Sequence, residues 1–143
     1  MIPVMFDKIL VAYHGTDRAL RAFDTAVQMA QLQNSELHMI SVAEDVPRHA
    51  ELLAEVEDAM QREDSRDSQL ARQAKLRAAL HSVSLHCDIV VGRRVRAISD
   101  FVRKGHFELL VIGESRSSFS GFVFGSTSEK LTNRVRCSVL VVK

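Results

Sequence analysis

Five short apolar runs, separated by segments long enough for a helix, constrain the fold of this chain more than any other feature. Most of them are continuously apolar instead of alternating with polar residues, which is typical of strands buried on both faces of a parallel sheet. The expected strands are 8–12, 36–42, 85–91, 109–112 and 139–142. Because parallel strands need right-handed crossovers, the pattern predicts an α/β fold: a doubly wound, five-stranded parallel sheet with helices on both faces, Rossmann-like.

The segments between these runs carry helix signals. Thr16 is a good helix cap, and apolar residues from Ala19 to Ala30 follow it at helical spacing. Further helical segments are expected over 49–82, interrupted at 64–68, and over 97–103 and 126–135. In the later part of the long segment the apolar residues are Leu70, Leu76 and Leu80. With no internal repeat or low-complexity linker, the 143 residues are expected to form a single domain, 1–143.

Composition excludes several functional classes. A net charge of +1 argues against a nucleic-acid binder, and no apolar run approaches the ~20 residues that a membrane span needs. The first residues show no export signal, so a cytoplasmic location is expected. Cys87 and Cys137 lie in or beside apolar runs without metal-type spacing, which favours free thiols. His38 and Cys87 are expected in the core, and no metal site is predicted.

The segment from Val111 to Lys130 carries the strongest functional signal. Gly113 ends a predicted strand, and Gly125 precedes a helix that Ser126 and Glu129 can cap as an S-x-x-E box. Free N–H groups at such a helix start attract anions. The planar guanidinium group of Arg116 is also suited to hydrogen bonds with phosphate oxygens. The segment therefore indicates a phosphate-bearing ligand. Arg93, Arg94 and Arg96 follow the third strand at the same edge, where one of them could attract phosphate.

These motifs resemble those of the universal stress protein family, whose nucleotide-binding members carry the pattern G-x-x-G-x9-G-[ST]. Here Gly113 to Arg116 corresponds to its first part and Gly125-Ser126 to its second. The opening run with its His-Gly-Thr turn, the second strand, Gly92 and the final strand also resemble the family. The resemblance covers nearly the whole chain and is weakest in the long middle segment.

Two departures from the family pattern concern the ligand. Arg116 replaces the second glycine, and only eight residues separate it from Gly125. A side-chain contact to phosphate would then replace a close backbone approach. His14 stands where nucleotide-binding relatives usually have an aspartate, although a neutral imidazole still accepts a hydrogen bond through one nitrogen.

The resemblance implies a site for ATP or another adenine nucleotide, with or without Mg²⁺. By resemblance, Ala12, Tyr13 and His14 line the nucleoside end, and the Val42 backbone contacts adenine. The residues implied to hold the phosphates are Gly113, Ser115, Arg116, Gly125, Ser126 and Thr127. The family also commonly dimerises through its last strand, so a homodimer and an unidentified protein partner are expected.

The sequence leaves three functions open. The favoured one is a stress-response regulatory protein that binds a nucleotide and hydrolyses little or none of it. The second is a dimeric interaction module of the same family with a degenerate site. The third and weakest is a true ATP hydrolase, which would need a base and carboxylates for a metal. No catalytic residue is predicted, because Asp17, Glu44 and Asp45 near the edge lack convincing spacing.

Overall fold

The computed structural model describes residues 5–43, 68–114 and 127–143. Its centre is a sheet with the strand order β3-β2-β1-β4-β5, in which every neighbouring pair is parallel. The strands are β1 (Lys8–Ala12), β2 (Glu36–Ala43), β3 (Leu85–Val91), β4 (Leu109–Gly113) and β5 (Ser138–Val142). The predicted fold class is confirmed, and each predicted strand agrees with the observed one to within a residue at either end.

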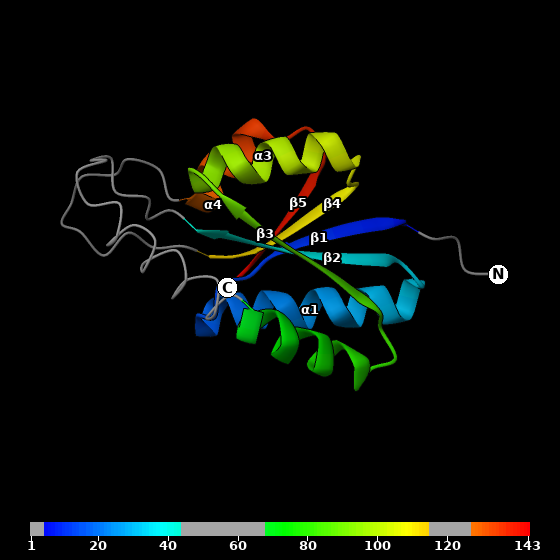
Figure 1. Cartoon of the computed structure of the whole chain (residues 1–143). Helices are drawn as coiled ribbons and strands as arrows, with labels where there is room; N and C mark the ends of the chain where they lie inside the picture. The colour runs from blue at the N-terminus through cyan, green and yellow to red at the C-terminus, as the bar shows by residue number, and fades with distance from the viewer. Residues whose placement is uncertain (1–4, 44–67, 115–126) are drawn as a thin grey trace, which may run out of the picture.

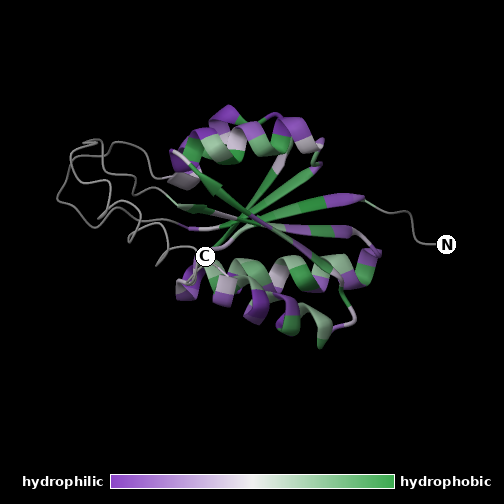
Figure 2. Ribbon diagram, in the orientation of Figure 1, coloured by the Kyte–Doolittle hydropathy of each residue, from purple (hydrophilic) through white to green (hydrophobic). Residues whose placement is uncertain are grey.

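Helices cover both faces of the sheet (Figure 1). On one face lie α1 (Asp17–Gln33) and a helical segment over 68–79; on the other lie α3 (Arg94–Gly105) and α4 (Thr127–Arg134). Figure 2 shows that α3 has mainly hydrophobic residues on the side facing the sheet and hydrophilic residues on its outer side. No helix of the described ranges is long and apolar enough to cross a membrane.

The central strands are buried on both faces, which explains their unbroken apolar runs. In β1, Ile9 and Val11 belong to the core cluster under α1, while Leu10 belongs to the cluster under α3 and α4. In β4, Leu110 and Ile112 likewise face α3 and α4. Burying each such side chain fully contributes roughly 1.5–3 kcal/mol, so the two clusters hold the layers together.

One predicted helix cap, Thr16, is confirmed. Thr16 is the N-cap of α1, and its Oγ1 accepts a hydrogen bond from the Ala19 N–H at 3.2 Å. The helix expected over 97–103 begins earlier, at Arg94, because Arg93 already has the extended backbone of an N-cap. The described part of the last predicted helix runs from Thr127 to Arg134, and Ser126 lies outside the described residues.

The fully buried residues of the segment over 68–79 are alanines. Ala74 and Ala78 belong to the core cluster that also contains residues of α1 and the sheet, whereas Leu76 and the following Leu80 are 70% and 84% exposed. Leu70 is only partly buried, so the leucine positions do not mark the inner face of this segment. Cys87 and His38, which were expected in the core, are only partly buried. Cys87 lies on β3, which is an edge strand, and His38 lies on β2, the strand next to it.

Candidate functional site

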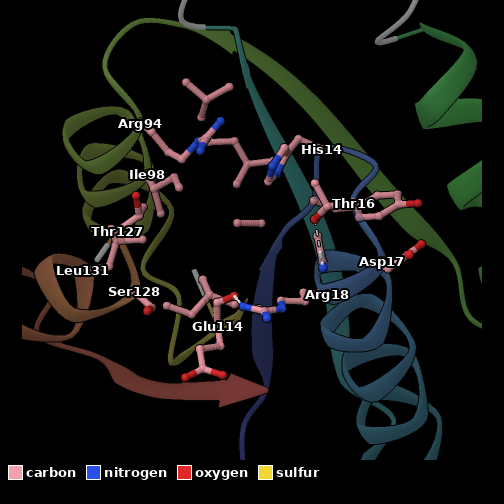
Figure 3. A pocket seen from close by; sticks show the side chains of 17 residues that line it. His14, Thr16, Asp17, Arg18, Arg94, Ile98, Glu114, Thr127, Ser128 and Leu131 are labelled. Carbon is pink, nitrogen blue, oxygen red and sulfur yellow. Dashed lines mark hydrogen bonds between the residues drawn. The ribbon is translucent and has the colours of Figure 1, made fainter. Parts of the chain in front are cut away.

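The sheet order creates a crevice between the carboxyl ends of β1 and β4. After β1 the chain continues to β2 and β3 on one side of β1, whereas β4 and β5 lie on the other side of β1. Ligands of open α/β sheets bind at such a switch point. A cavity of about 380 Å³ lies there, within the roughly 300–1,000 Å³ typical of small-molecule sites (Figure 3). Its lining residues are Ala12, Tyr13, His14, Thr16, Asp17, Arg18, Ala19, Ile40, Val42, Arg94, Ile98, Ile112, Gly113, Glu114, Thr127, Ser128 and Leu131.

Three helices reach this cavity with their first described residues. These are Asp17 of α1, Arg94 of α3 and Thr127 of α4, and each lines the cavity. Figure 3 shows α3 and α4 on one side of the cavity and the start of α1 on the other. Helix N-termini carry partial positive charge and unsatisfied N–H groups. The N-cap Arg93 of α3 makes no side-chain capping hydrogen bond. The site therefore favours an anionic group.

Apolar side chains make up one part of the wall. They come from three strands and two helices: Ala12, Ile40, Val42, Ile98, Ile112 and Leu131. All six belong to, or pack against, the core cluster under α3 and α4. A flat apolar group can lie against this wall while a charged group meets the helix starts. The cavity is thus suited to a ligand with one apolar and one anionic part.

Side chains that can hydrogen-bond enter from both sides of the cavity. Arg94 projects from α3 and His14 from the loop after β1 (Figure 3). Arg18 Nη1 donates a hydrogen bond to the Glu114 backbone oxygen at 3.4 Å, which links the start of α1 to the end of β4. Of the three arginines after β3, only Arg94 lines the cavity, while Arg93 and Arg96 are exposed.

Gly113 is required by a neighbouring backbone. A Cβ at this position would lie 2.8 Å from the Arg18 carbonyl oxygen and 3.1 Å from the Ala19 nitrogen. Side-chain carbons do not approach backbone atoms that closely, so only glycine lets the end of β4 pass the first turn of α1. The sequence suggested that Gly113 lets a ligand approach the backbone. In the structure, Gly113 lines the cavity and also leaves room for the first turn of α1.

The structure brings six predicted site residues to one cavity. These are Ala12, Tyr13, His14, Val42, Gly113 and Thr127. The other four, Ser115, Arg116, Gly125 and Ser126, lie outside the described residues. Sequence reasoning missed the contributions of Arg18, Ile98 and Leu131. A usable signal existed for Ile98 and Leu131, since each lies four residues after the first residue of its helix and hence on the same helix face.

Tyr13 reaches the cavity while its ring packs elsewhere. The ring contacts Phe23 of α1 with centroids 5.3 Å apart, and it packs against the core cluster on that face of the sheet. Burial raises the pKa of the Tyr13 hydroxyl, which stays protonated near neutral pH. The Tyr13 N–H donates to the Ile40 carbonyl at 3.1 Å, which fixes the backbone at the mouth of the site.

Comparison with known proteins assigns the chain to a family. The sequence profile of the universal stress protein family matches residues 5–143. A universal stress protein of Thermus aquaticus is 33% identical, and the protein YxiE of Bacillus subtilis is 27% identical; each alignment covers 97% of this chain and 100% of the relative.

Solved structures agree on the fold. UspA of Lactobacillus plantarum superposes with a TM-score of 0.84 at 25% identity, covering 94% of this chain and 96% of that one. A universal stress protein in complex with cAMP gives 0.78 at 24% identity, covering 96% and 97%. An Arabidopsis thaliana member with AMP bound gives 0.70 at 17% identity, covering 95% and 90%.

Proposed function

Because the chain belongs to the universal stress protein family, we propose that its cavity binds an adenine nucleotide, with ATP as the ligand, and that the bound state regulates a partner. The observation that carries this proposal is the 380 Å³ cavity, which combines an apolar wall with three helix starts. Relatives of the same fold have been solved with cAMP and with AMP. An adenine base suits the apolar wall, and phosphates suit the helix N-termini.

In the proposed mode, the base lies near Ala12 and the Val42 backbone, with Tyr13 and His14 at the nucleoside end. The phosphates lie toward Gly113 and Thr127, where Ser115, Arg116, Gly125 and Ser126 complete the loop. Arg94 adds a fixed positive charge. A Mg²⁺ ion would arrive with the nucleotide, since this ion is usually held by phosphates and water with few protein ligands.

Hydrolysis is proposed to be slow or absent. Among the described residues, two carboxylates line the cavity, from Asp17 at the start of α1 and Glu114 after β4. They lie on different sides of its rim in Figure 3 instead of facing one another. ATP hydrolysis needs a positioned water with a base, usually beside a metal that carboxylates hold. The pair offers no such arrangement, so nucleotide occupancy, and not turnover, is the proposed signal.

Calorimetric titration with ATP, ADP and AMP tests the binding. The wild-type protein is expected to bind at one site per chain, and Arg94→Ala is expected to lose about tenfold in affinity, as for a lost hydrogen bond to a charged group. Arg96→Ala is the matched control, because it removes the same charge from an exposed position on the same helix. If wild-type protein binds no nucleotide, the site is degenerate and the proposal is wrong.

Two further parts of the proposal concern assembly and location. β5 is an edge strand, and its unpaired side could join a second copy in a homodimer. Sedimentation equilibrium should then give twice the chain mass; a single-chain mass at micromolar concentration would contradict the dimer.

A cytoplasmic location fits the two free thiols, Cys87 and Cys137, which lie on opposite edges of the sheet.

A further inference from the structure

A second cluster of polar side chains lies at the opposite edge of the sheet from the cavity. Glu36 is the first residue of β2, His38 follows on the same face, and His86 is the second residue of β3. That face is the one covered by α3 and α4, since Ile40, two residues beyond His38, belongs to the core cluster beneath these helices. These residues lie in the first part of their strands, whereas the cavity lies at the carboxyl ends, so the cluster is separate from the proposed nucleotide site.

The strand register brings the three side chains together. His38 and His86 are direct partners across β2 and β3, and their rings stack with centroids 4.6 Å apart. His38 Nε2 lies 2.6 Å from Glu36 Oε1. One ligand atom from each of the three residues lies within 4.8 Å of the others. Tetrahedral zinc bonds of about 2.0–2.2 Å place ligand atoms roughly 3.3–3.5 Å apart, so modest side-chain rotations would converge them.

We propose that Glu36, His38 and His86 form a binding site for a divalent transition-metal ion of the zinc type. Two imidazoles and one carboxylate are the donor set of many zinc sites, whereas Ca²⁺ and Mg²⁺ prefer oxygen ligands alone. Three protein ligands leave the fourth position of a tetrahedral ion to water. His86 and Glu36 are exposed, so an ion can reach the site from solvent.

The surroundings of His38 decide which ring nitrogen would bind the ion. Its Nδ1 is buried and has no hydrogen-bond partner among the described residues. Its Nε2 lies beside the Glu36 carboxylate and is therefore the nitrogen that faces the proposed ion. The ring is also held in place, because the Phe107 ring meets it edge-on with centroids 5.0 Å apart. A pre-positioned imidazole loses little entropy on binding metal.

Lys8 is the neighbouring charge that opposes a cation. It pairs in register with Glu36. The hydrogen bond from His38 is the main cause that lowers the pKa of the Glu36 carboxyl, and the Lys8 charge contributes less. Its ammonium is engaged on the other side, where Nζ donates to the Gly105 carbonyl at 2.7 Å and lies 4.7 Å from the Phe107 ring centroid. Glu36 thus remains available as a ligand, and the nearby positive charge makes the affinity moderate.

Titration of EDTA-treated protein with Zn²⁺ by calorimetry, and with Co²⁺ by visible absorption, tests the site. Wild-type protein is expected to bind one ion in this cluster. His86→Ala and Glu36→Gln should each weaken binding more than about tenfold, since even outer-shell groups are worth about 10–100-fold. Lys8→Met should strengthen it about threefold by removing a like charge. Both ligand substitutions are at exposed positions, and circular dichroism verifies the fold.

Two controls separate this site from other donors. His81→Ala removes an exposed histidine outside the cluster, and Cys87→Ala removes a thiol that packs against the opposite face of the sheet. Both are expected to bind zinc as wild type does. Equal zinc affinity in wild type and His86→Ala, weaker binding in Lys8→Met, or no zinc binding by the wild type would overturn the proposal. ATP affinity should not change in His86→Ala, so the two proposals can fail separately.

Discussion

Replacing Gly113 by alanine tests the packing of β4 against α1. The new Cβ would lie 2.8 and 2.9 Å from the carbonyl oxygen and carbon of Arg18. These are backbone atoms in the first turn of a helix whose cap, Thr16, and whose buried face are both fixed. They cannot rotate away as the end of a side chain would, so β4 or the whole helix start must shift.

The expected loss of stability follows from two opposing effects. Overpacking of this kind costs about 1–3 kcal/mol, while replacing glycine removes backbone entropy from the unfolded chain and returns about 0.4–1 kcal/mol. A net loss of about 1–2 kcal/mol is therefore expected. At about 2.1 cal/mol/K per residue, the unfolding entropy of this chain is about 0.3 kcal/mol/K near 60 °C. The melting temperature should fall by about 3–7 °C.

Thermal unfolding followed by circular dichroism measures this shift, with Glu114→Ala as the control at the next position. That control adds no Cβ and leaves the Glu114 backbone oxygen available to Arg18. A Gly113→Ala protein that melts within about 1 °C of wild type would refute the steric argument. If it also lost nucleotide affinity, Gly113 would serve ligand approach alone, as the sequence motif suggested.

Three further predictions concern single contacts. Thr16→Ala should cost about 1 kcal/mol in the free energy of unfolding by urea, whereas Thr16→Ser, which keeps the capping oxygen, should cost much less; equal losses would contradict the capping role. Asp24→Asn weakens the two-pronged contact to Arg77 (2.6 and 2.7 Å), and because both partners are exposed by more than a third it should cost at most about 1 kcal/mol, less at high salt. Burial raises the pKa of the Cys87 thiol, so iodoacetamide should alkylate it at pH 8 more slowly than a free cysteine; an equal rate would show that the thiol is not shielded.

Patterns that act over a few residues were readable from the sequence. The apolar runs marked all five strands, most clearly β1 and β4, because strands buried on both faces cannot contain regular polar positions. Thr16 marked the start of α1, since its side chain bonds an N–H only three residues away. Glycines and a helix cap after β4 marked the edge of the sheet where a ligand cavity lies. Each of these signals depends on neighbours in the chain.

Contacts between distant segments were decided only by the tertiary structure. Three nearby arginines look equivalent in sequence, yet only Arg94 lines the cavity, because the start of α3 turns that helix face toward β1 and β4. In the segment over 68–79, Ala74 and Ala78 are buried while Leu76 is exposed, because the alanine face is the one that packs against the core cluster under α1. His38 and His86 became a cluster only through strand pairing. Local periodicity and capping thus determined the elements, while long-range register and the space between packed elements determined which side chains meet.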